Sequence, residues 1–153
     1  MLRAPSGRQR FNVLGALHAI THQLITVTNE SYINATSVCE LLEKIAALGL
    51  STPVTVVMDN ARYQRCRLVI ERAKQLDIEL LFLPPYSPNL NLIERLWRFV
   101  RKECLYNHYY EHFDLFKQAI TDCLAQTAGR HQAALDRLLT LEFQTFASAS
   151  RAR

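Results

Sequence analysis

The sequence VTVVMDNAR occupies residues 54–62, and IELLFLPPYSPNLNLIERLWRFVRK occupies residues 78–102. Residues 54–58 are apolar apart from Thr55, which is typical of a strand covered on both faces by helices. Residues 78–83 form a second apolar run. Between them, residues 60–77 carry apolar side chains at helical spacing, which predicts a helix of about 15 residues. A strand, a helix and a strand in this order predict a βαβ unit with two parallel strands.

Two carboxylates lie where these elements end. Asp59 follows the first strand directly, and Glu94 lies one turn into a helix that comes after the proline-rich loop of residues 84–91. Magnesium prefers oxygen ligands and keeps several waters, so a phosphoryl-transfer site needs only a few carboxylates from different elements. A structural role fits as well, because a glutamate near a helix start interacts favourably with the helix dipole. The bare pattern leaves both roles open.

The helix that carries Glu94 is amphipathic. At about 100° per residue its apolar positions form one stripe that we expect to be buried; it consists of Ile93, Leu96, Trp97, Val100 and Cys104. One flank of the same helix carries Glu94, Arg98 and Arg101 at the border between core and solvent.

Shorter patterns predict the remaining elements. Residues 3–10 are polar and basic with Pro5 and Gly7, which predicts a loop. Residues 11–20 and 24–28 are predicted to form an antiparallel hairpin. Residues 34–37 offer capping side chains ahead of a helical pattern that stops at Gly49. Further helices are predicted over residues 113–128 and 133–146, and a disordered tail over residues 148–153.

Length and composition predict one domain, which occupies residues 1–147. The chain has 153 residues, 49% of them hydrophobic, and a net charge of +4. Its basic residues are mostly arginine, which matches phosphate geometry and favours a nucleic-acid partner. The four cysteines lie far apart without a C-x-x-C pair, so neither a zinc ribbon nor a disulfide framework is indicated, and a reducing cytoplasm is expected. No apolar run reaches the roughly 18 residues of a membrane span.

Two histidines offer an alternative metal site. His108 and His112 lie four residues apart with Glu111 between them. The order differs from H-E-x-x-H and the sequence offers no evident third ligand, so zinc binding is the weaker alternative to a structural role. His18 and His22 fit the predicted hairpin better than a site.

Three segments carry a resemblance to a known family. They are VVMDNAR at residues 56–62, LPPYSPNLN at residues 83–91 and IERLW at residues 93–97, with 34 residues between Asp59 and Glu94. Together they resemble the catalytic core of mariner-type and related bacterial insertion-sequence transposases, the Asp-Asp-Glu (DDE) superfamily. Residues 6–17 also resemble the second strand of that family and its approach. The resemblance extends from about residue 6 to about residue 107.

The resemblance implies a ribonuclease H-like mixed sheet flanked by helices. It also implies Mg²⁺- or Mn²⁺-dependent cleavage and strand transfer of DNA, with Asp59 and Glu94 as the second and third acidic metal ligands. Asn60 and Asn91 flank these carboxylates and are candidates to orient them. The implied partners are DNA at transposon ends and target, in a bacterial, nucleoid-associated setting.

Four cations are candidates for contact with the DNA backbone, namely Arg62, Arg98, Arg101 and Lys102. The alternative for the last three is a solvated helix face on which Glu94 and Arg98 pair at i, i+4.

This sequence departs from the family pattern at several positions. Gln64 and Leu92 stand where many relatives have His and Pro. No Asp precedes Asp59, whereas the family has its first catalytic Asp at the end of a central first strand upstream of the segment matching residues 6–17. We therefore expect that strand to be missing, leaving two sheet edges unpaired. The chain is expected to need an upstream transposase fragment or a second copy of itself.

Two functions follow as hypotheses. The first is a transposase catalytic-domain fragment that cleaves and joins DNA. The second is a catalytically inactive remnant that only binds DNA or a protein partner. The two hypotheses differ in whether the chain still cleaves DNA. The loss of one of three acidic ligands bears on this, because it should weaken the metal site and remove most cleavage. A more distant alternative is an unrelated α/β protein whose acidic residues are structural.

Overall fold

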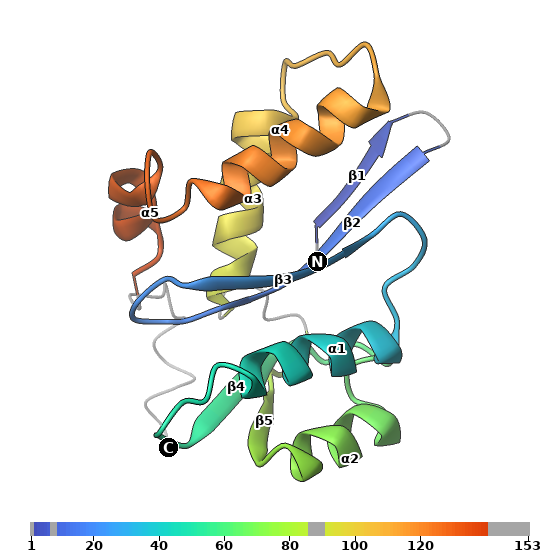
Figure 1. Ribbon diagram of the computed structural model, residues 1–153, viewed down its shortest axis with the longest axis vertical. Coiled ribbons are helices and arrows are strands. Elements are labelled where there is room, and N and C mark those ends of the chain that lie inside the picture. The colour runs from blue at the N-terminus through green and yellow to red at the C-terminus, as the bar shows by residue number, and fades with distance from the viewer. Residues whose placement is uncertain (1, 7–8, 86–90, 141–153) are drawn as a thin grey trace.

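The computed structural model describes residues 2–6, 9–85 and 91–140. Figure 1 shows the order of its elements along the chain. The strands and helices are β1 (Leu2–Ser6), β2 (Gln9–Leu17), β3 (Leu24–Asn29), α1 (Ala35–Ala46), β4 (Val54–Met58), α2 (Arg67–Gln75), β5 (Ile78–Phe82), α3 (Leu92–Cys104), α4 (Phe113–Ala125) and α5 (Gln132–Leu138). None of these described helices is long and apolar enough to cross a membrane.

The strands form two separate sheets. β1, β2 and β3 make an antiparallel sheet in that order, and β4 pairs in parallel with β5. The predicted hairpin and the predicted βαβ unit are therefore confirmed. The predicted loop over residues 3–10 is wrong, because β1 ends at Ser6 and β2 begins at Gln9. Pro5 does not prevent the pairing, since an edge strand tolerates a residue without an N–H.

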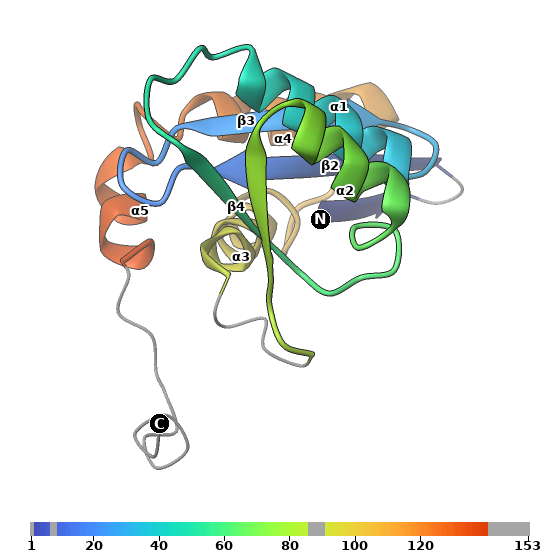
Figure 2. The ribbon, with the colours of Figure 1, turned by 90° about the horizontal axis from the view of Figure 1, so that it is seen from below.

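β2 separates two hydrophobic cores. Phe11 and Val13 point into a core that α3, α4 and α5 complete. Leu14 points the other way, into a core built from α1, α2, β3, β4 and β5. This is the two-residue alternation of a strand. Figure 1 shows α1 and α2 below β2 and β3 with most of α3 above them, and Figure 2 shows α1 and α3 on opposite sides of β2. The whole predicted stripe of α3 is buried, including Trp97 at 0% exposure.

A glycine lets α3 approach β2 closely. A Cβ atom added at Gly15 would lie 2.7 Å from Cη2 of Trp97 and 3.0 Å from Cδ1 of Ile93. Real Cβ atoms do not come this close to a ring, so the packing of α3 on β2 requires the absent side chain. Gly15 thus fixes where the helix carrying Glu94 lies along the sheet.

The predicted start of α1 is confirmed by its cap. The Asn34 side chain accepts from the backbone N–H of Ser37, and the Ser37 hydroxyl accepts from the backbone N–H of Asn34. Such a capping box satisfies two N–H groups that the first turn leaves without partners. The helix ends at Ala46, shortly before Gly49 with φ +62°.

Two expectations for the βαβ unit are wrong. The faces of β4 and β5 that carry Val57 and Leu81 are open, with these side chains 42% and 52% exposed, because α3 packs on β2 and not on this pair. The helix between the strands has nine residues instead of about 15. The segment before it forms turns, in which the N–H groups of Gln64 and Arg65 donate to the carbonyl of Ala61.

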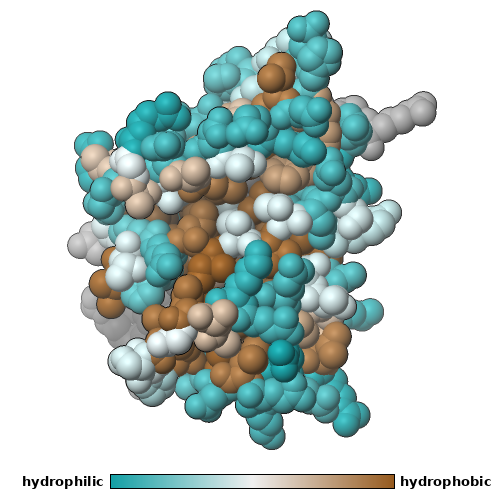
Figure 3. Space-filling view, viewed as in Figure 1, coloured by the Kyte–Doolittle hydropathy of each residue, from teal (hydrophilic) through white to brown (hydrophobic). Residues whose placement is uncertain are grey.

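Apolar and polar surfaces are separated on the face of the molecule seen in Figure 3. Apolar side chains gather in a band across the middle of this face, while hydrophilic side chains cover its two ends. Residues 86–90 of the proline-rich loop, residues 141–146 of the last predicted helix and the predicted tail of residues 148–153 lie outside the described residues.

Candidate active site

The end of β4 presents Asp59. This residue directly follows Met58 and is half-buried. The backbone N–H of Leu83 donates to the carbonyl of Met58 at 2.8 Å, so the parallel pairing of β4 with β5 continues to the residue before Asp59. The position of Asp59 is therefore set by strand hydrogen bonds on its amino-terminal side.

The start of α3 presents Glu94. Asn91 is the N-cap of this helix, and its side-chain oxygen accepts from the backbone N–H of Ile93 at 3.3 Å. The backbone N–H of Glu94 donates to the carbonyl of Asn91 at 3.1 Å. Glu94 is half-buried and lies in the first helical turn, where a carboxylate is favoured by the helix dipole.

Asn91 also joins the two elements. Its Nδ2 donates to Oδ1 of Asp59 at 3.3 Å. One amide side chain therefore caps α3 with its oxygen and holds the strand-end carboxylate with its nitrogen. The structure brings Asp59, Asn91 and the first turn containing Glu94 into one place, although Asp59 and Asn91 are 32 residues apart.

Within the described part of the chain, two amide oxygens on the segment that follows Asp59 are buried without a hydrogen-bond partner. They are Oδ1 of Asn60 and Oε1 of Gln64, and Gln64 is only 8% exposed. A buried acceptor without a donor costs about 1–3 kcal/mol, so these atoms suit a site where a metal-bound water or a ligand donates. Sequence reasoning named Asn60 but noted Gln64 only as a departure from the family pattern.

The donor set here consists of oxygens, which suits Mg²⁺ or Mn²⁺. Within residues 2–6, 9–85 and 91–140 there is no group of three or more His, Cys, Asp or Glu side chains that could hold a metal ion. The site therefore has two acidic residues on adjoining elements and, on the residue after Asp59, an amide oxygen without a hydrogen-bond partner. The residues present fit a hydrated hard cation but do not form a closed cage.

The predicted DNA-contacting cations lie at the surface to different degrees. Arg62, Arg98 and Lys102 are exposed, whereas Arg101 is half-buried. Arg95, which the sequence analysis did not single out, has a structural contact: its Nη1 donates to the carbonyls of Leu138 and Thr140 at 3.3 and 2.9 Å. This guanidinium ties α3 to the end of α5.

The histidines have structural surroundings. His22 contacts Asp136 through Nδ1 at 3.0 Å and the carbonyl of Leu139 through Nε2 at 3.1 Å, which ties the β2–β3 turn to α5. Nδ1 of His18 accepts from the backbone within the same turn. His108 and His112 are exposed, and the described residues give them no third ligand.

Buried thiols pack the helices together. A hydrogen bond with Cys123 lowers the pKa of the Cys104 thiol, and the same bond together with burial raises the pKa of Cys123. Burial also raises the pKa of Cys39. All four cysteines are free, and the pair formed by Cys104 and Cys123 belongs to the contact between α3 and α4.

Comparison with known proteins places this arrangement in a family. Residues 2–117 match the model of the DDE superfamily endonuclease family. The chain belongs to this family. The match includes Asp59, Asn91 and Glu94, so the hydrogen-bonded junction lies within the DDE endonuclease domain.

Two relatives connect the domain with bacterial proteins. An uncharacterized protein of Sinorhizobium fredii, y4pE/y4sA, is 33% identical over 88 residues, which are 54% of this chain and 60% of that protein. The uncharacterized 39 kDa protein of insertion element IS630 from Shigella sonnei is 26% identical over 105 residues, 68% of this chain and 31% of that protein. The chain thus spans less than two thirds of the length of either relative.

Solved structures show the fold of this DDE domain. The crystal structure of the catalytic core domain of BIV integrase matches with a TM-score of 0.57 and 15% identity, over 84% of this chain and 80% of that one. A chain of the simian T-cell lymphotropic virus intasome, solved with a PP2A regulatory subunit, matches with the same TM-score and identity over 80% of this chain and 43% of its own length. The predicted ribonuclease H-like fold is therefore confirmed.

Proposed function

We propose that this DDE domain is the catalytic part of an insertion-sequence transposase, which cleaves and joins DNA strands by phosphoryl transfer in the bacterial nucleoid. The observation that carries the proposal is the Asn91 side chain, which caps the helix of Glu94 and donates to Asp59. A side chain with both contacts holds two carboxylate-bearing elements in one arrangement. Preorganisation of this kind is what a phosphoryl-transfer site needs.

In this proposal Asp59 and Glu94 hold Mg²⁺ or Mn²⁺. Such an ion, when bound, stabilises charge on phosphate oxygens and activates water or a hydroxyl. Asn91 keeps Asp59 oriented through its 3.3 Å hydrogen bond. The orphaned oxygens of Asn60 and Gln64 accept hydrogen bonds from waters around the site.

The same proposal assigns the exposed cations to DNA at transposon ends and target. Arg62 follows Asp59 by three positions, and Arg98, Arg101 and Lys102 lie on the helix that carries Glu94. Cations on these elements can contact phosphates on both sides of a cut site. Phosphate contacts position the strand without reading its sequence.

A third acidic ligand is proposed to come from another polypeptide segment. Among the described strands β4 hydrogen-bonds only to β5, and Val57 and Leu81 leave one face of this pair exposed. An unpaired edge beside an apolar face is a surface on which a further strand can pair. We propose that an upstream transposase segment or a second copy of the chain supplies this strand and the missing carboxylate.

The test is nicking of supercoiled DNA with Mn²⁺ by the purified chain, alone and together with an upstream transposase segment. Wild type is expected to nick in at least one of these conditions. Asp59→Asn is expected to lose at least about 10-fold in rate there, since even loss of a group that orients a metal ligand costs roughly 10–100-fold, and Asp77→Asn is expected to nick like wild type. Asp77 is a matched control because it is exposed and has φ +57°, a conformation that Asn adopts readily. Equal nicking by wild type and Asp59→Asn would contradict the proposal.

The second candidate is a catalytically inactive remnant that only binds DNA or a protein partner. It is favoured by the absence of a third acidic ligand within the described residues. This candidate predicts DNA binding without Mn²⁺-dependent nicking, also after addition of an upstream transposase segment. Nicking restored by that segment would favour the first function.

A further inference from the structure

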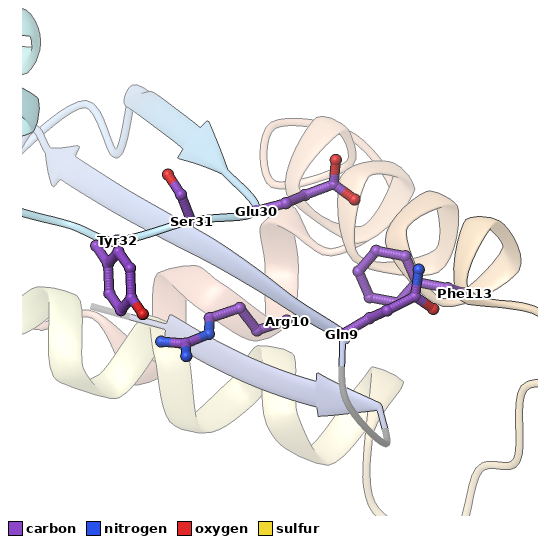
Figure 4. Close-up of a pocket in the computed structure, with 6 residues that line it drawn as sticks. All are labelled: Gln9, Arg10, Glu30, Ser31, Tyr32 and Phe113. Carbon is purple, nitrogen blue, oxygen red and sulfur yellow. The ribbon is translucent and has the colours of Figure 1, made fainter.

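An open pocket lies where β2 begins, β3 has just ended and α4 begins. Its volume is about 430 Å³, which is within the range of small-molecule sites, and it is lined by Gln9, Arg10, Glu30, Ser31, Tyr32 and Phe113. Figure 4 shows Tyr32 and Phe113 at its two ends, with Gln9 and Arg10 along one side and Glu30 and Ser31 along the other. The pocket therefore combines two aromatic rings with polar and charged groups.

This pocket and the Asp59 site lie toward opposite ends of α3. Ile93 and Trp97, at the start of the helix, approach Gly15 in the second half of β2, whereas the pocket uses the first two residues of β2. Phe113 begins the helix that follows α3. The ten residues from Glu94 to Cys104 span roughly 15 Å along α3.

At the Tyr32 end of the pocket a cation lies over the aromatic ring. Cζ of Arg10 lies 4.7 Å from the centroid of the Tyr32 ring, a cation–π contact. Tyr32 is 67% exposed, so much of its ring surface remains accessible. An aromatic face beside a guanidinium is the pairing that proteins use for single-stranded nucleic acid, because bases stack on the ring and phosphates meet the cation.

The two sides of the pocket supply hydrogen-bonding groups. Oε1 of Glu30 pairs with Nζ of Lys117 at 3.1 Å, and this hydrogen bond raises the pKa of Lys117. Nζ of Lys117 in turn lies 5.3 Å from the centroid of the Phe113 ring. A carboxylate inside the pocket repels a free phosphate but accepts from the amino groups of bases. The amide of Gln9 and the hydroxyl of Ser31 can donate and accept.

We propose that this pocket binds one unpaired nucleotide of a DNA strand, with its base stacked on Tyr32 and its phosphate on Arg10. The inference rests on the proposed function in so far as the ligand is DNA. It adds a contact for an unpaired strand toward the other end of α3 from the carboxylates. Gln9, Glu30 and Ser31 contact the edge of the base, so the pocket favours a nucleotide over inorganic phosphate.

The test compares two labelled duplexes of equal length, one blunt and one with a three-nucleotide single-stranded overhang, by fluorescence anisotropy with the full chain. Wild type is expected to bind the overhang duplex about tenfold more tightly, as expected for one stacked base. Tyr32→Ala is expected to lose this gain while binding the blunt duplex as before, and Tyr32→Phe to keep it. A 2-aminopurine in the overhang should lose fluorescence on binding wild type but not Tyr32→Ala.

Matched controls separate stacking from charge and from folding. Tyr109→Ala removes a tyrosine that is 89% exposed and outside the pocket, and it should keep the gain. Arg67→Ala removes a guanidinium side chain that is 90% exposed on α2, and it should weaken overhang binding less than Arg10→Ala does. Thermal melting should show that each variant folds.

Four outcomes would count against the proposal. If wild type binds the blunt duplex and gains nothing from the overhang, the proposed nucleotide pocket is wrong and the proposed function still stands. The same conclusion follows if the gain from the overhang persists in Tyr32→Ala. Failure of wild type to bind either duplex overturns both. Inhibition by inorganic phosphate at the same concentration as by a mononucleotide would show an anion site and not a nucleotide site.

Discussion

The two sheets of the molecule differ in how they are covered. β2 has helices on both faces, and Val13 on this strand is 0% exposed. The β4–β5 pair has helices on one face only, and Val57 on β4 is 42% exposed. Asp59 comes from the open pair, whereas Glu94 comes from the helix packed on the covered sheet. The candidate site thus lies at the junction of a half whose sheet is covered on both faces and a half whose sheet is covered on one, and Asn91 forms a hydrogen bond across this junction.

The largest expected difference is in the free energy of unfolding when valine is replaced by alanine, in separate variants, on β2 and on β4. Val13→Ala should lower the free energy of unfolding by about 2 kcal/mol or more, because it removes fully buried carbon atoms and leaves a cavity. Val57→Ala should cost less than about 1 kcal/mol, since this side chain is already partly in solvent. Urea unfolding of both variants measures the difference. Similar losses would mean that the face of β4 is covered in solution.

The close packing of α3 on β2 gives the next effect. Gly15→Ala should destabilise the protein by about 1–3 kcal/mol, because its Cβ would lie 2.7 Å from the Trp97 ring. In a Trp97→Phe background, which lacks the contacting ring atoms, the cost should shrink, and a double-mutant cycle would show this coupling. Gly129→Ala is the control, because a Cβ there meets only the flexible end of Gln126 within 3.0 Å. Additive losses would argue against the contact.

Substitutions of Asn91 separate its two roles. Asn91→Ala should cost about 1 kcal/mol as a lost N-cap and also weaken Mn²⁺ binding. Asn91→Asp should keep the cap, since Asp is a good N-cap, but lose the donor to Asp59. Asn34→Ala removes the cap of α1 and should cost similar stability with no effect on Mn²⁺. Calorimetric titration with Mn²⁺ measures the second effect; unchanged affinity in both Asn91 variants would exclude the bridging role.

The smallest expected effect concerns the link between α3 and α5. Arg95→Lys removes the guanidinium geometry that serves two carbonyls and should cost about 0.5–1.5 kcal/mol. Hydrogen exchange should increase in α5 and stay unchanged in α1. Faster exchange throughout the chain would show that Arg95 supports the whole fold and not this link.

Hydrophobic periodicity and capping residues in the sequence correctly predicted two features of the fold. The buried stripe of α3 and the start of α1 depend on residues close together in sequence, so local patterns sufficed. The open face of β4 could not be predicted, because a strand of Val residues reads the same whether a helix covers it or not. It depends on α3 packing against Gly15, a contact between residues about 80 positions apart.

The candidate site was predictable to a similar degree. Asp59 and Glu94 followed from strand and helix ends together with the family resemblance, and Asn91 was named because it flanks a carboxylate. Its hydrogen bond to Asp59 is a tertiary contact that no local pattern encodes. The strand over residues 2–6 was missed because backbone pairing at an edge needs neither apolar residues nor the absence of proline.

Thermal melting with and without Mn²⁺ tests most directly whether Asp59 and Glu94 form a metal site. We predict that Mn²⁺ at about ten times its Kd raises the Tm of wild type and of Asp77→Asn by roughly 3 °C, and that Asp59→Asn and Glu94→Gln show no rise. Such a result would locate the ion at the junction of the two halves. An equal rise in Asp59→Asn, or no rise in wild type, would contradict the claim that these carboxylates form a metal site.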